Sequence, residues 1–167
     1  MIDSPTMSKI ELEPIGVVRS PRDEVRDDEW GGLQAEIVLD PRFEADALDG
    51  IDEFSHAEIL FFFDRVDPAK IVAGARHPRN NRDWPAVGIF AQRGKGRPNR
   101  IGSTIVRIVR REGRVLHVAE LDAVDGTPVL DIKPVMREFL PRDEVRQPRW
   151  SSELMQRYWS DFESEDP

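Results

Sequence analysis

The chain has no cysteine and only three histidines in 167 residues. A disulfide framework and a thiolate metal site are therefore excluded, and the histidines lie tens of residues apart, which disfavours a zinc site. No run approaches the roughly 18 consecutive apolar residues of a membrane helix. The start of the sequence, MIDSPT, lacks the basic and apolar segments of a secretory signal. We expect a cytoplasmic protein with no metal ion and no membrane partner.

Familiar nucleotide-binding and hydrolytic motifs are also missing. No Gly-x-Gly-x-x-Gly follows a predicted strand, and the tripeptide at 94–96, Gly-Lys-Gly, does not complete a phosphate-binding loop. No serine has the neighbours of a nucleophile elbow. These absences argue against a dinucleotide-binding fold, a phosphate-loop enzyme and a serine-triad hydrolase.

The charges that are present are unevenly distributed. The length fits one ordinary domain, and the net charge of −8 argues against bulk electrostatic binding to nucleic acid. The segment 93–114 nevertheless holds eight basic residues and one acid. This distribution predicts one basic face on an acidic body, with an ordinary solvated surface cluster as the plain alternative.

The basic loop, residues 93–100, is the densest part of that segment and follows a strand-like apolar approach at 88–91. Its cations are Arg93, Lys95, Arg97 and Arg100, separated by glycine, proline and asparagine, which bend the backbone. No acid occurs between residues 84 and 111, so local partners that would neutralise the cations are missing. Guanidinium groups on such a loop suit a phosphate or carboxylate.

Short apolar runs predict a mainly β fold. The period-two alternation of apolar residues at 33–39 is typical of a half-buried strand, and the most apolar run, at 54–63, indicates a central strand. His56 within it is interpreted as structural rather than catalytic. Strands are predicted at 15–20, 33–39, 54–63, 101–109, 115–121 and 129–132, with the fourth and fifth joined as a hairpin.

Helices are predicted only at the periphery. Asp40 as N-cap and Gly50 as stop predict a short helix at 41–49. A C-terminal helix is predicted from residue 151, with an apolar stripe of Leu154, Tyr158 and Phe162 that packs on the body or on a second subunit.

Two connections have the composition of functional loops. The charged segment 21–30 ends in Trp30 beside two glycines, which suits either a lid over a ligand or a plug at the end of a barrel. The segment 64–84 shows no periodicity, and loops of about twenty residues in a compact domain tend to be functional or mobile.

Five segments combine these features in a specific order: IGVVRSP at 15–21, FSHAEILFFF at 54–63, GIFA at 88–91, RPNRIG at 97–102 and LDAVDGTPVLDIKP at 121–134. In this order they resemble the TrmO family, also called the TsaA-like, YaeB-like or VirR-like family, over roughly residues 12–140. The resemblance implies a small closed or nearly closed β-barrel with peripheral short helices that binds S-adenosylmethionine, usually as a homodimer. It also implies methylation of the N6 nitrogen of threonylcarbamoyl-adenosine at position 37 of tRNA.

The resemblance carries a set of expected site residues. Asp131 and Lys133 are the expected catalytic residues. Asp131 would accept the amine proton, or would serve only as a structural partner for Lys133. Lys133 would contact the substrate. Arg97, Asn99 and Arg100 would contact tRNA. Arg65 and Arg93 would lie near the cofactor carboxylate. The expected cofactor-binding residues are Glu29, Trp30, Gly31, Arg65, Arg93, Leu121, Asp122, Val124, Asp125, Gly126 and Thr127.

The sequence departs from the family pattern mainly in the basic loop, where Gly94 and Lys95 replace serine and proline and Arg100 replaces a proline. We expect substrate recognition to differ there. A non-catalytic adenosylmethionine-binding module and a small-molecule methyltransferase, which the acidic body favours, remain alternatives. The predicted organisation is a flexible leader at 1–10, a β-barrel adenosylmethionine-binding domain at 11–147, and a C-terminal helix with an acidic tail at 148–167.

Overall fold

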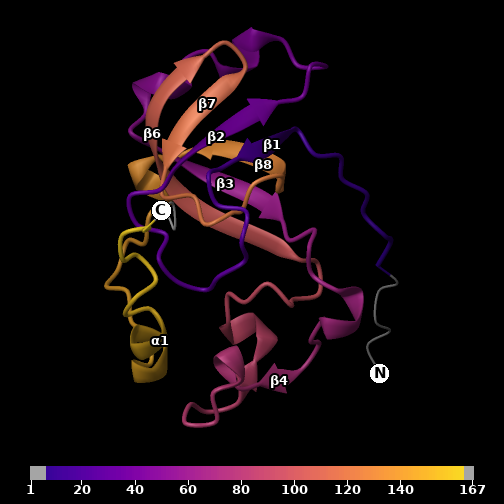
Figure 1. The fold of residues 1–167 in the computed structure, drawn as a ribbon, viewed down its shortest axis with the longest axis vertical. Coiled ribbons are helices and arrows are strands. Elements are labelled where there is room, and N and C mark those ends of the chain that lie inside the picture. Colours follow the sequence, from indigo (N-terminus) through magenta and orange to yellow (C-terminus); the bar gives the residue numbers. More distant parts are fainter. Residues whose placement is uncertain (1–6, 164–167) are drawn as a thin grey trace.

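A computed structural model describes residues 7–163 and contains a closed antiparallel barrel with strand order β1-β2-β7-β6-β3-β8 (Figure 1). The predicted mainly β fold is therefore confirmed. The barrel strands are β1 (Gly16–Arg19), β2 (Gln34–Leu39), β3 (His56–Phe62), β6 (Ile101–Glu112), β7 (Val115–Ala119) and β8 (Pro128–Pro134). Each corresponds to a predicted strand, and β6 extends three residues further than expected.

Alternation along the strands produces the barrel core. In β3 the buried residues are Ala57, Ile59 and Phe61, while the residues between them face outward and are partly exposed. Gly102 of β6 pairs with Phe61, and a Cβ at this glycine would lie only 2.4 Å from the Phe61 ring. The wall can therefore close around a large aromatic residue because its neighbour has no side chain.

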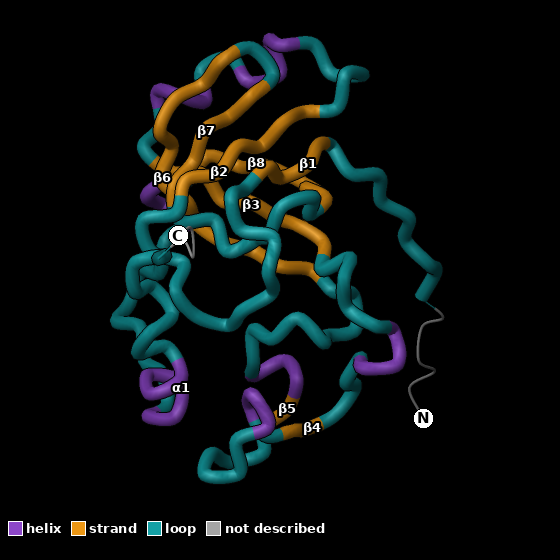
Figure 2. The backbone as a smooth tube through the Cα atoms, in the orientation of Figure 1, coloured by secondary structure: helices purple, strands orange, loops and turns teal. Residues whose placement is uncertain are grey.

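A second region, residues 64–100, lies outside the barrel, at the lower right of Figure 2. It consists of short pieces held by a buried amide, because Gln92 Nε2 donates to the carbonyl oxygens of Arg76 at 3.0 Å and Val87 at 2.9 Å. The predicted strand-like approach at 88–91 is wrong, since residues Ile89–Ala91 form a 3-10 helix. The elements are η3 (Pro68–Lys70), β4 (Ala75–Arg76), η4 (Pro78–Asn80), β5 (Val87–Gly88) and η5 (Ile89–Ala91).

The predicted helix at 41–49 is replaced by a turn and a shorter 3-10 helix, η1 (Ala45–Leu48). The Asp40 carboxylate accepts a hydrogen bond from the backbone N–H of Arg42, and the Asp40 carbonyl accepts one from Phe43. Both bonds stabilise a turn in place of a helical start. Two further 3-10 helices flank the strands, η2 (Ile51–Glu53) and η6 (Arg137–Phe139).

The C-terminal helix is also shorter than predicted. It spans α1 (Arg149–Leu154), and the chain continues as turns, so Tyr158 and Phe162 are not part of a helical stripe. The reason is competition for backbone groups: the carbonyls of Arg157, Tyr158 and Ser160 accept hydrogen bonds from another loop. None of the helices between residues 7 and 163 has the length and hydrophobicity of a membrane span.

The first six and last four residues, which carry most of the predicted leader and acidic tail, lie outside the described residues. The remainder of the predicted leader, residues 7–10, is exposed.

Candidate functional site

Three segments meet at one end of the barrel and form the Asp122 site. They are the loop at 20–33, the turn at 120–127 and the C-terminal strap, which we define as residues 157–162. The Asp122 carboxylate accepts hydrogen bonds from the hydroxyls of Thr104 and Tyr158. Thr104 pairs with Ile59 and points into the barrel. Asp122 therefore lies at this end of the barrel, next to its interior.

Tyr158 is the strap residue that reaches Asp122. Burial raises the pKa of the Tyr158 phenol well above its ordinary value, and the nearby Asp122 charge and their hydrogen bond act in the same direction. Arg93 and Arg79 oppose this shift through their charges, which places both guanidinium groups in the electrostatic environment of the site. Tyr158 is consequently a neutral hydrogen-bond donor at physiological pH.

The strap pairs with three of the expected cofactor-binding residues. Backbone N–H groups of Glu29, Trp30 and Gly31 donate to strap carbonyls at 3.1, 2.9 and 2.9 Å, and the Gly31 carbonyl accepts from Phe162 at 2.9 Å. A Cβ at Gly31 would lie 2.3 Å from the Trp159 carbonyl oxygen, so only glycine permits this approach. The Arg157 side chain adds an ion pair to Glu29 at 2.7 Å.

Trp30 is a buried plug in this structure. Its side chain packs with Leu33, Val124, Tyr158 and Phe162, and the Arg22 guanidinium carbon stacks 3.7 Å from the ring centre. Of the two roles predicted for Trp30, a lid over a ligand and a plug at the end of a barrel, its packing matches the plug. A contact between Trp30 and the cofactor stays a prediction.

The Asp-Gly turn at 125–126 positions the last expected cofactor-binding residues. Gly126 has a φ of 81°, which favours glycine, and the Asp125 side chain accepts from the Ser20 backbone N–H at 3.0 Å. Arg65, from the 64–100 region, donates to the Asp125 carbonyl at 2.7 Å and to the Asp23 carbonyl at 2.6 Å. Thr127 is buried and donates through its hydroxyl to the Val124 carbonyl at 2.8 Å.

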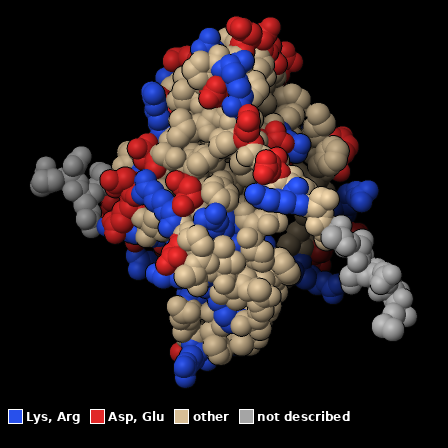
Figure 3. All heavy atoms as spheres, turned by 90° about the vertical axis from the view of Figure 1, so that its right-hand side faces the viewer, with Lys and Arg blue, Asp and Glu red and all other residues tan. Residues whose placement is uncertain are grey.

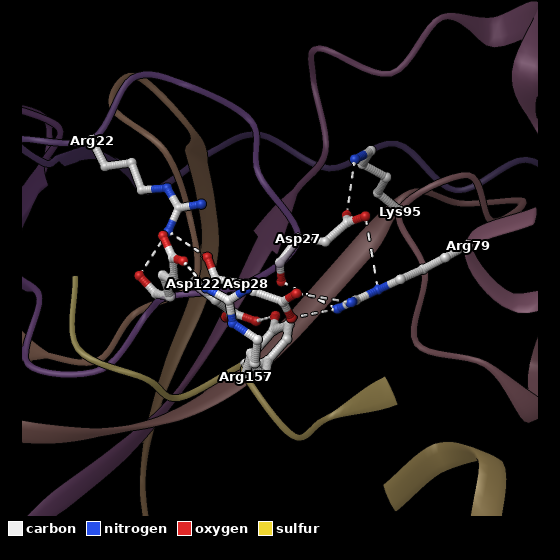
Figure 4. Close-up of polar contacts among 9 residues, drawn as sticks. Arg22, Asp27, Asp28, Arg79, Lys95, Asp122 and Arg157 are labelled. Atoms are coloured by element: carbon white, nitrogen blue, oxygen red, sulfur yellow. Dashed lines mark hydrogen bonds and ion pairs between the residues drawn. The ribbon is translucent and has the colours of Figure 1, made fainter. Parts of the chain in front are cut away.

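The acidic loop, which we define as residues 23–29, pairs with cations of the 64–100 region (Figure 4). Arg79 contacts both carboxylate oxygens of Asp28, at 2.8 and 3.0 Å, and Lys95 lies 3.6 Å from Asp27. The basic loop lacks acidic partners nearby in sequence, as predicted, but Lys95 has one that is distant in sequence. Arg79 has a φ of 49°, a backbone conformation that is uncommon outside glycine.

Two of the three residues expected to contact tRNA form hydrogen bonds to backbone carbonyls within the 64–100 region. Arg97 donates to the Gln92 carbonyl at 2.8 Å, and Arg100 donates to the Val66 carbonyl at 3.1 Å while stacking on Phe62. Asn99 is exposed. On the face drawn in Figure 3, basic side chains are interspersed with acidic ones.

The expected catalytic pair lies on the opposite surface of the barrel wall. Asp131 and Lys133 form an ion pair at 3.0 Å, and they pair in register with Leu60 and Glu58, which face outward. The Asp131 carboxylate raises the pKa of Lys133. Within one chain, therefore, the structure does not bring this pair together with Asp122.

Four residues of the site were missed by sequence reasoning: Arg22, Arg79, Thr104 and Tyr158. Tyr158 is the only tyrosine of the chain, but its position in a predicted helical stripe concealed its role. The site fits an adenosylmethionine-like ligand in one respect: it offers a free buried donor for an acceptor group of the ligand. This donor is Arg22 Nη2, which has no hydrogen-bond partner in the described part of the chain. Over residues 7–163 no cluster of three histidine, aspartate or glutamate residues could hold a metal ion.

Comparison with known proteins identifies relatives of this arrangement. A model of the tRNA-methyltransferase O N-terminal domain matches residues 20–139. A "Probable S-adenosyl-L-methionine-binding protein" of Pyrococcus abyssi is 35% identical over 139 residues, which cover 80% of this chain and 72% of that protein. The Escherichia coli tRNA (adenine(37)-N6)-methyltransferase is 36% identical over 147 residues, which cover 81% of this chain and 62% of that protein.

The barrel also matches solved structures. The crystal structure of TrmO from Pseudomonas aeruginosa superposes with a TM-score of 0.70 at 27% identity, covering 88% of this chain and 64% of that one. The chain thus spans less than two thirds of the Escherichia coli and Pseudomonas aeruginosa relatives.

Proposed function

Because this chain belongs to the tRNA-methyltransferase O family, we propose that it is an S-adenosylmethionine-dependent methyltransferase acting on the N6 nitrogen of adenine 37 in tRNA. The observation that carries the proposal is the extent of the family match, since residues 20–139 contain every site residue expected from the sequence. The acceptor that we propose is threonylcarbamoyl-adenosine.

The chain's own residues would bind and orient the reactants. When bound, adenosylmethionine supplies a methyl group on a sulfonium, which departs as a neutral thioether. This transfer needs neither a metal ion nor a covalent nucleophile. Residues 121–127 and the loop at 29–31 would position the cofactor, and the buried Trp30 cluster would exclude water from one side. Asp131, held beside Lys133, would accept the proton that the acceptor nitrogen loses; since one chain keeps this pair apart from Asp122, it would do so at the cofactor site of a second copy.

The basic loop would hold the tRNA backbone. Arg97, Asn99 and Arg100 lie on a loop without acids of its own, so phosphate contacts there would outweigh the unfavourable net charge of the chain. Such contacts release counterions, and tRNA affinity should therefore fall steeply with salt.

The direct test is methyl transfer to two matched tRNAs. One carries threonylcarbamoyl-adenosine at position 37 and the other carries unmodified adenosine there, and the products are identified by nucleoside mass spectrometry. We expect transfer to the first tRNA only. Cofactor binding without transfer to either tRNA, across a range of salt concentrations, would contradict the proposed activity.

One observation favours a non-catalytic adenosylmethionine-binding module as the second candidate. Lys95 and Arg79, which would otherwise strengthen a tRNA surface, are already paired with Asp27 and Asp28. Under this alternative the chain binds the cofactor and the same assay yields no methylated nucleoside.

We also propose that the protein is a cytoplasmic homodimer. The segment after β8 leaves apolar side chains in solvent, with Phe139 86% exposed and Val145 68% exposed. Burial of such residues against a second copy would remove apolar surface from water. Light scattering coupled to size-exclusion chromatography should give twice the chain mass of 19.2 kDa, and a concentration-independent monomer would contradict this.

A further inference from the structure

Arg22 is a buried arginine in the loop that leads to the Asp122 site. Its side chain is 3% exposed, and its guanidinium stacks on Trp30 at 3.7 Å, with Phe162 of the strap 5.7 Å away. Nη1 donates to the carbonyls of Asp28 at 3.0 Å and Glu29 at 2.9 Å, and Nε donates to the Glu24 carbonyl at 3.3 Å. These bonds fix the plane of the guanidinium.

The remaining nitrogen, Nη2, has no hydrogen-bond partner within residues 7–163. No carboxylate in this range forms an ion pair with Arg22, and burial, followed by the charge of Arg26, lowers its pKa. A buried cation with an unsatisfied N–H group is unfavourable unless an anion or acceptor reaches it. The position of Nη2 therefore indicates a place for an acidic group that residues 7–163 do not supply.

The two arginines that the family resemblance assigned to the cofactor carboxylate are engaged elsewhere. Arg65 donates through both terminal nitrogens to backbone carbonyls, and Arg93 donates to the Ser103 carbonyl. Arg22, in contrast, stacks on Trp30 and donates to the Glu29 carbonyl, so it contacts two of the expected cofactor-binding residues. Its Nη2 has no hydrogen bond to the other residues drawn in Figure 4.

We propose that Arg22 Nη2 binds the carboxylate of the amino-acid part of adenosylmethionine, an inference that rests on the proposed function. The carboxylate is the only anionic group of this cofactor, and a charge-assisted hydrogen bond would satisfy both the buried donor and the buried charge. Because Phe162 covers the guanidinium, the strap moves aside when the ligand enters.

The test compares two ligands that differ only in this carboxylate, adenosylmethionine and decarboxylated adenosylmethionine, by isothermal titration calorimetry. The wild-type protein should bind adenosylmethionine roughly ten- to a hundredfold more tightly, the range expected for a hydrogen bond between charged groups. Arg22→Gln should bind the two ligands within about threefold of each other, because the donor to the carboxylate is lost. Arg114→Gln, an exposed arginine at the turn between β6 and β7, should discriminate as the wild type does.

The outcomes separate this inference from the proposed function. Wild-type protein that binds neither ligand would refute the proposed function and the inference with it. Wild-type protein that discriminates, together with an Arg22→Gln variant that discriminates equally well, would overturn only the role of Arg22. If Arg22→Gln does not fold, Arg22→Lys is measured in its place: it should lose most of the discrimination, and full retention would contradict the inference.

Discussion

Tyr158→Phe tests the polar network at the end of the barrel. The substitution keeps the ring in its cluster but removes the hydroxyl that donates to Asp122. Of its two side-chain hydrogen bonds in the described part of the chain, this carboxylate then keeps the one from Thr104. A hydrogen bond to a charged group contributes about 1.5–3 kcal/mol, and we expect the free energy of unfolding at neutral pH to fall by this amount. Denaturant unfolding with an unchanged m-value measures the loss.

The same pair of proteins gives a pH dependence whose sign follows from the raised pKa of Tyr158. In the unfolded chain the phenol ionises near its ordinary value of 10, whereas in the folded protein it stays protonated well above that value. The unfolded state therefore binds fewer protons above pH 10, and stability that is complete below pH 10 is lost as the pH rises. Relative to Tyr158→Phe, the wild type should lose about 1.4 kcal/mol by pH 11.

Because Tyr158 is the only tyrosine, near-ultraviolet absorbance of the phenolate reports this one group. Thr104→Val is the matched control: it removes the other donor to Asp122 at a similar cost and leaves the alkaline titration of Tyr158 shifted upward. Native protein whose tyrosine titrates at its ordinary value would refute the buried contact with Asp122.

Three further predictions concern the surroundings of the site. Gly31→Ala should lower the free energy of unfolding by about 2–3 kcal/mol in a denaturant titration, because its Cβ would collide with a strap carbonyl. The control is Gly88→Ala, whose Cβ meets nothing within 4 Å and which should change the free energy of unfolding by no more than about 0.5 kcal/mol. A double-mutant cycle of Asp28→Asn and Arg79→Gln should give a coupling energy of about 0.5–1 kcal/mol that shrinks in high salt, and a salt-independent value would contradict a partly exposed ion pair. Arg97→Ala should weaken tRNA binding for all sequences and reduce the salt slope of log affinity by about one, and an unchanged slope would show that the basic loop is not the tRNA surface.

The barrel was predictable because its signals are local. Alternation at 33–39 and the apolar run at 54–63 determine which side chains face the core, and each reads as a strand without reference to the rest of the chain. The ordered motifs also led to the correct family, since the domain match spans residues 20–139.

The ends of the helices and the ion pairs near the site could not be predicted from local sequence, because both depend on contacts between distant segments. Tyr158 and Phe162 have helical spacing, but the backbone groups of the loop at 29–31 compete for the carbonyls that would extend the helix. Likewise, no local pattern connects Lys95 to Asp27, which lie 68 residues apart. The assignments of individual residues to cofactor, substrate and catalysis stay predictions that the experiments above address.

The pairing between the strap and residues 29–31 also sets an order for folding during synthesis. Glu29 and Arg157, which form an ion pair, are separated by 128 residues, whereas the last barrel strand ends at Pro134. The ribosome therefore makes a complete set of barrel strands before it makes the segment that satisfies the backbone of the 29–31 loop. A nascent chain should acquire a protease-resistant barrel first, with the loop beside Asp122 ordered only when the strap emerges.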